Sequence, residues 1–162
     1  MELILKEIER AVDLEIYYLA LAMALTLPDM CAALASSSGE TTRDLYIEWY
    51  EENLANVLPW MTAKDCWKMR SAVLHQGKTG HPHMQHPRVL FTLPNSKGVQ
   101  ISNNMVDGAL NFYVPTFCRD VVGVTRAWLQ ANKDEENVVR NMPNMVQLRP
   151  NGVEVLPFPL IS

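Results

Sequence analysis

The apolar stretch from Ile16 to Leu25 is the feature that most constrains the fold of this chain. Its ten residues carry no charge, and they follow a segment in which Ile4, Ile8 and Val12 recur at helical spacing. We therefore predict one long first helix over Leu3–Leu25. Beyond Ile16 this helix is apolar on every side, which requires burial by other helices of the chain or by a second subunit.

Length and composition indicate a single domain. A chain of 162 residues with 48% hydrophobic content can bury one proper core. The ten-residue apolar run is about half of the roughly 20 residues needed to cross a bilayer, and the charged start has no signal-peptide pattern. Cys31, Cys66 and Cys118 are odd in number and form no CxxC pair, so each is predicted to be a reduced core residue. We expect a cytoplasmic protein with no membrane partner and no cofactor.

The other elements follow from capping residues, apolar spacing and turn signals. The predicted helices are a short one from Pro28 through Leu34, one from Thr42 to about Asn53, one from Thr62 to Gly77, one from Pro115 to Leu129 and a short one near residues 135–140. The predicted strands are Arg88–Leu93 and Gly98–Ser102, joined by a turn at residues 94–97, and Ala109–Val114. A further turn is predicted at residues 149–152. The fold class is mainly α, with a small β-hairpin or sheet element in the C-terminal half.

Charge is distributed unevenly along the chain. Residues 1–53 contain three basic and eleven acidic side chains, whereas residues 54–88 contain five basic side chains and one acidic one, Asp65. All four histidines lie in the basic segment. Such a segment can serve a phosphate-bearing partner, or it can pack against the acidic N-terminal helices. The sequence leaves both interpretations open.

Arg70 has an unusual position on the helix predicted over residues 62–77. On an ideal helix it projects from the middle of an otherwise apolar face. The other residues of that face are Cys66, Trp67, Val73 and Leu74. An unpaired buried guanidinium costs several kcal/mol, so Arg70 needs either a polar cleft or an acidic partner, for example Glu48 or Glu52.

His75 lies about 140° around the same helix from Arg70, on the polar side with Lys64, Lys68 and Ser71. A histidine at a helix C-terminus can bind free carbonyl groups, and the helix dipole favours its protonated form. Arg70 and His75 of one chain therefore do not share a face. To act on one phosphate they need the helix to unwind before His75, or a second chain to complete the site.

The segment RSAVLH, residues 70–75, resembles the Arg-x4–6-His motif of HEPN domains. A wider similarity to bacterial HEPN-like proteins runs through AVDLEIYYLALAMALTLPDMCAAL, DCWKMRSAVLHQG, VPTFCRDVV and MVQLRPNG, which are spread over most of the length of the chain. HEPN domains are helical bundles that typically dimerise. Many resemble metal-independent endoribonucleases, while others are binding or scaffold modules. Ser71 stands where active members often have Asn, Asp or His, and the β element after residue 88 is foreign to the minimal domain.

The resemblance implies a single HEPN-like domain over residues 1–162. Its parts are a helical core with the motif over 1–77, a His/Pro loop with short strands over 78–114, and a helix with a tail over 115–162. The resemblance also implies a homodimer, and it leaves room for RNA and for an antitoxin or another protein as partners.

In an active HEPN domain the motif residues would be Arg70, Ser71 and His75. His75 would move a proton between the RNA 2′-hydroxyl and the leaving oxygen. Arg70 would stabilise the charge on the phosphorus as a bidentate ligand, and Ser71 would contact phosphate or orient His75. The residues expected to bind RNA are Lys64, Lys68, Lys78, His81 and Arg88. The alternative is a catalytically inactive interaction or scaffold module in which Arg70 belongs to a structural ion pair.

A histidine cluster follows the motif. His81, His83 and His86 lie within six residues and could hold a transition metal. Their spacing matches no well-defined structural zinc pattern, so a solvated, proline-stiffened loop is the preferred interpretation and no metal site is predicted. Under the HEPN resemblance this loop borders the motif and could line an RNA cleft.

Overall fold

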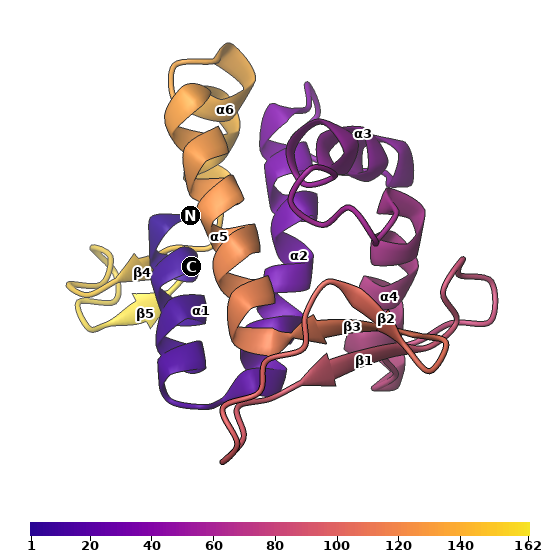
Figure 1. Ribbon diagram of the computed structural model, residues 1–162. Coiled ribbons are helices and arrows are strands. Elements are labelled where there is room, and N and C mark those ends of the chain that lie inside the picture. Colours follow the sequence, from indigo (N-terminus) through magenta and orange to yellow (C-terminus); the bar gives the residue numbers. More distant parts are fainter.

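A computed structural model describes residues 1–162 as a bundle of helices with two small sheets (Figure 1). The helices are α1 (Glu2–Asp13), α2 (Tyr17–Ala35), α3 (Arg43–Asn53), α4 (Ala63–Gln76), α5 (Val114–Ala131) and α6 (Glu136–Asn141), followed by a 3-10 turn at Met142–Asn144. The strands are β1 (Val89–Thr92), β2 (Asn104–Val106), β3 (Ala109–Tyr113), β4 (Leu148–Arg149) and β5 (Leu160–Ile161). The prediction of a mainly α protein with a small sheet element is confirmed.

The prediction of a single helix over Leu3–Leu25 is wrong. The chain breaks after Asp13, because Glu15 adopts the left-handed conformation with φ 61° and Ile16 donates its backbone N–H to the carbonyl of Ala11. A second helix then begins at Tyr17. The apolar periodicity continued across this break, so the pattern gave no sign of it.

The prediction of a new helix at Pro28 is also wrong. Pro28 lies inside α2, which runs on to Ala35. Proline cannot donate a backbone hydrogen bond, but the rest of the helix is held by contacts with α1, α3, α4, α5 and α6. The apolar character of α2 on all sides is therefore satisfied largely within one chain.

By length and composition α2 is apolar enough to cross a membrane, with a mean hydropathy of 1.6 over its most apolar window. In the bundle 56% of that window is buried, so packing between helices accounts for most of its apolar surface. The continuous core formed around α2 includes Leu25, Tyr46, Phe112 and Phe117, all nearly inaccessible to solvent. The three cysteines are free and buried, as predicted.

The first sheet differs from the predicted hairpin. Its strand order is β1-β3-β2, with β1 parallel to β3 and β2 antiparallel to β3. Residues 98–102 form no strand. The hairpin turn lies instead at Asp107 and Gly108, both with positive φ, as a two-residue turn between twisted strands requires. Asn95 bonds to the backbone of Lys97 and Val99, so residues 94–99 close a local turn of their own.

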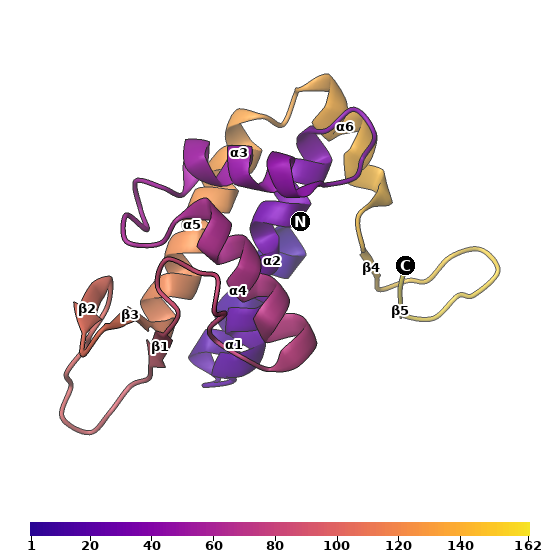
Figure 2. The same ribbon diagram turned by 90° about the vertical axis from the view of Figure 1, so that its right-hand side faces the viewer.

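The second sheet consists of β4 and β5, which belong to a segment over residues 145–162 that we call the arm. The predicted turn at residues 149–152 is confirmed, with Gly152 at φ 73° and its N–H donated to the carbonyl of Arg149. Figure 2 shows the arm standing away from the helical body. None of its residues is buried.

Candidate functional site

Helix α4 carries the motif residues and has the predicted ends. The Thr62 hydroxyl accepts the N–H of Asp65, and Gly77 closes the helix in the left-handed conformation. Both capping predictions are confirmed. The helix continues through Gln76, so it does not unwind before His75.

Arg70 forms an ion pair with Asp29 of α2, which brings its Nε within 3.1 Å of the Asp29 Oδ2. Both side chains are largely buried, at 15% and 14% exposed. The expected acidic partner thus exists, but the two suggested residues, Glu48 and Glu52, are exposed on α3 and make no ion pair. Arg70 is thus paired with α2, the helix that contacts each of the other five helices.

Aromatic side chains complete the surroundings of Arg70. Its guanidinium carbon lies 4.0 Å from the ring centroid of Trp67 and 6.0 Å from that of Tyr46. A cation over an aromatic face at such distances is attracted by the ring quadrupole. The Tyr46 hydroxyl donates to the Cys66 Sγ at 3.1 Å, so this ring has a fixed place. Arg70 is therefore both paired and stacked.

The ion pair is electrostatic rather than a hydrogen bond. The buried Nε of Arg70 and the buried Oδ1 of Asp29 both lack a hydrogen-bond partner. Burial raises the pKa of Asp29 to about 6, although the positive charge of Arg70 acts in the opposite direction. The charged form of Asp29 is thus incompletely compensated, and this carboxyl group can take up a proton near neutral pH.

The structure does not bring the three motif residues together. Arg70 points to α2, whereas His75 is exposed in the last turn of α4 and Ser71 is half-buried. No hydrogen bond or ion pair joins any two of them. A reaction at one phosphate would need a second chain, or the release of Arg70 from Asp29.

Asp65 has a role that the capping pattern did not predict. Its carboxylate is buried and accepts the backbone N–H of Gln85 at 3.0 Å and that of His86 at 3.4 Å. It therefore fixes to α4 the loop of residues 80–87, which carries three histidines and which we call the histidine loop. Lys68 adds a second link, since its Nζ donates to the His83 carbonyl. Gly80 approaches the Pro87 carbonyl so closely that a Cβ would clash, which closes the neck of the loop.

The predicted RNA-binding residues surround α4 and this loop. Lys64, Lys78 and Arg88 are exposed, while Lys68 and His81 are half-buried. Arg88 donates to the carbonyl of Asp107 at 3.4 Å, and Lys68 is engaged with the loop backbone. Binding of RNA here stays a prediction.

The histidines of the loop do not converge on one point. The rings of His81 and His83 lie 5.4 Å apart, and the His81 Nδ1 accepts the backbone N–H of His83. No group of three histidine, cysteine or acidic side chains anywhere in the chain is arranged to hold a metal ion.

Sequence reasoning missed Asp29, although a signal for it exists. It is the single charged residue between Ile16 and Ala35. A lone charge on an apolar helix needs a partner for the same reason as Arg70 does, so the two could have been matched. The prediction of a separate helix from Pro28 hid this signal, because it placed Asp29 in the first turn of a short helix, where an acid is favourable without a partner.

In comparisons with known proteins, no family model, no curated protein and no solved structure matches the chain.

Proposed function

We propose that this chain is a catalytically inactive HEPN-like interaction module in which Arg70 stabilises the bundle instead of binding phosphate. The observation that carries the proposal is the ion pair of Arg70 with Asp29, stacked on Trp67. A phosphate-binding arginine must present its planar group to the ligand. Here one edge of that group faces a carboxylate and its plane lies against an indole ring.

Release of Arg70 for catalysis would be costly. It would leave Asp29 without its cation and expose the face of Trp67 that the guanidinium covers. Removal of one partner from a buried pair typically costs about 3–5 kcal/mol. The raised pKa of Asp29 reduces that cost, because the acid can become neutral when Arg70 is absent.

This proposal is tested by comparing stability and ribonuclease activity in one set of variants. Arg70→Met keeps the length of the side chain and its contact with Trp67 without a charge. We expect the double variant Arg70→Met with Asp29→Leu, which replaces the whole pair, to unfold in urea within about 1 kcal/mol of the parent, since hydrophobic residues of similar volume often replace a buried ion pair at little cost. We expect the wild type to leave varied RNAs intact with and without EDTA. Cleavage that survives EDTA and is abolished by His75→Ala would overturn the proposal.

A second candidate is RNA binding, or cleavage in a dimer, through Arg70 and His75. It is supported by exposed side chains along α4 and after it: Lys64 lies in the first turn of the helix, His75 lies in its last turn, and Lys78 and Arg88 lie in the segment that follows. Fluorescence anisotropy with a labelled single-stranded RNA tests it. If RNA binds here, a Lys64→Gln and Lys78→Gln double variant should bind several-fold more weakly, and its affinity should depend less on salt.

The matched control is Lys97→Gln with Lys133→Gln, which removes two positive charges from other regions of the chain. If both double variants bind equally, the interaction follows net charge only, and this face is not an RNA site.

A further inference from the structure

An apolar groove lies between α1, α2 and the base of the arm, with a volume of about 590 Å³. Its apolar lining includes Leu14, Leu19 and Met23 from the helical body, and Val146, Leu148 and Ile161 from the arm. Glu7 and Arg10 are its only charged lining residues. A contiguous apolar surface of this kind on a small domain marks an interaction site.

The arm carries a second exposed apolar surface. Val155 is 86% exposed, and Leu156 and Phe158 beside it are also exposed. The backbone hydrogen bonds of residues 147–162 join arm residues only to one another. An isolated two-stranded hairpin is at best marginally stable in water, so the arm needs a further surface to pack on.

The tip of the arm has a defined shape. Gly152 has φ +73°, and a Cβ at this position would collide with the backbone of Leu156 and Phe158. Only glycine allows the two limbs of the tip to approach so closely. Val155 and Phe158 are thereby presented in a fixed arrangement, which lowers the entropy lost when they bind.

We infer that the groove of one chain receives the arm of a second copy, and that the exchange is reciprocal about a two-fold axis. The charges of the two surfaces are complementary, since the arm carries Arg149 and Glu154 and the groove carries Glu7 and Arg10. The base of the arm already forms one wall of the groove, so an incoming arm would lie against its counterpart. Such self-complementary contacts are the usual basis of two-fold dimers.

This inference rests on the proposed interaction module and names its partner, a second copy of the chain. The first test measures the mass of the full chain by sedimentation equilibrium at micromolar concentrations. We expect a wild-type dimer and a monomer for Phe158→Asp and for Leu19→Asp, with unchanged circular dichroism. The matched control is Val99→Asp, which puts the same charge on a comparably exposed residue outside both surfaces and should remain dimeric.

The second test distinguishes arm exchange from any other dimer. Phe158→Cys and Met23→Cys are made in separate chains and mixed under oxidising conditions, and the native cysteines do not interfere because they are buried. A disulfide-linked dimer should form in the mixture, and little should form in either variant alone.

A wild type that is monomeric at tens of micromolar overturns the inference. A dimer unaffected by Phe158→Asp overturns it too, because the arm is then not part of the interface. A monomer that binds palmitate in the groove would instead identify a lipid as its occupant. None of these outcomes changes the unfolding or ribonuclease results for Arg70, so failure of the inference and failure of the proposed function are distinguishable.

Discussion

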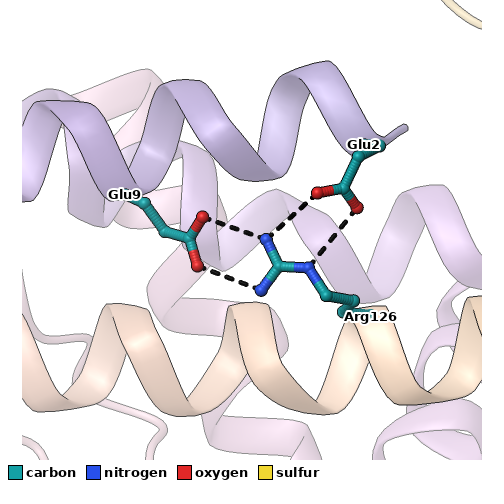
Figure 3. A network of polar contacts seen from close by, with 3 residues as sticks. All are labelled: Glu2, Glu9 and Arg126. Atoms are coloured by element: carbon teal, nitrogen blue, oxygen red, sulfur yellow. Dashed lines mark hydrogen bonds and ion pairs between the residues drawn. The ribbon is translucent and has the colours of Figure 1, made fainter.

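Arg70 and Arg126 are two arginines that meet acids of the N-terminal helices in opposite ways. Arg126 of α5 makes four hydrogen bonds to Glu2 and Glu9 of α1, at 2.9–3.4 Å (Figure 3). It is 40% exposed. Arg70 is 15% exposed and contacts Asp29 without a hydrogen bond from its Nε.

The comparison shows that the ion pair with the better hydrogen-bond geometry is not the pair whose loss costs more stability. Arg126 has the better geometry, and its bonds to Glu9 and Glu2 raise its own pKa. Water can replace those bonds when they break, so exposed pairs contribute little to stability. The Arg70 pair has poorer geometry, but water does not reach it freely. Breaking it from one side leaves an uncompensated buried charge.

The largest expected effect is therefore that of Arg70→Ala, which removes the guanidinium group from Asp29 and from the ring of Trp67. Asp29 is then left buried without its cation, and the free energy of unfolding should fall by about 3 kcal/mol. Urea unfolding at pH 7 measures the loss. Arg43→Ala is the matched control, since it removes an exposed arginine of α3 and should change stability by less than about 0.5 kcal/mol. Equal losses in the two variants would contradict the buried-pair argument.

The pH dependence of stability should differ between the wild type and the Asp29→Asn variant. The pKa of Asp29 is about 6 in the folded state and 3.8 for the free side chain. Between these values the folded state binds more protons, so the contribution of Asp29 to stability falls as pH rises from about 4 to about 6. Lowering the pH from about 7 to about 5 should stabilise the wild type by about 1 kcal/mol relative to the variant. Parallel pH profiles of the two proteins would refute the raised pKa.

The smallest expected effect is that of Arg126→Met. Loss of this exposed network should lower the free energy of unfolding by about 0.5–1 kcal/mol, and high salt should reduce the difference because screening weakens the wild-type pairs. Arg119→Met is the control, since Arg119 makes only one exposed contact, to Asp13 at 2.9 Å. A loss for Arg126→Met that equals that for Arg70→Ala would remove the distinction between the two sites.

Much of the fold could be predicted from local signals. Thr62, Gly77 and Pro115 each mark a helix end through chemistry that acts within a few residues, and all three lie at such ends in the structure. The predicted short helix near residues 135–140 corresponds to α6. The break at Glu15 and the continuation of α2 through Pro28 were not predicted, because both depend on packing against other helices more than on the local sequence.

The sheet and the candidate site show the same limit. Asp107–Gly108 is a strong hairpin signal and joins β2 to β3, whereas the predicted turn at residues 94–97 lies in the loop between β1 and β2. The parallel pairing of β1 with β3 has no local signature. For Arg70, the need for an acidic partner could be predicted from its place on the helix, whereas the identity of Asp29 depends on how α2 and α4 pack.

The path of the histidine loop is fixed mainly by contacts to its backbone. Asp65 binds backbone N–H groups of residues 85 and 86, and Gly80 closes the neck against the backbone of Pro87. The imidazole of His81 adds one bond, from the backbone N–H of His83, whereas those of His83 and His86 make no hydrogen bond. New side chains can therefore replace His83 and His86 while the loop keeps its path, so mutation can change the chemistry of these two positions without disturbing the fold.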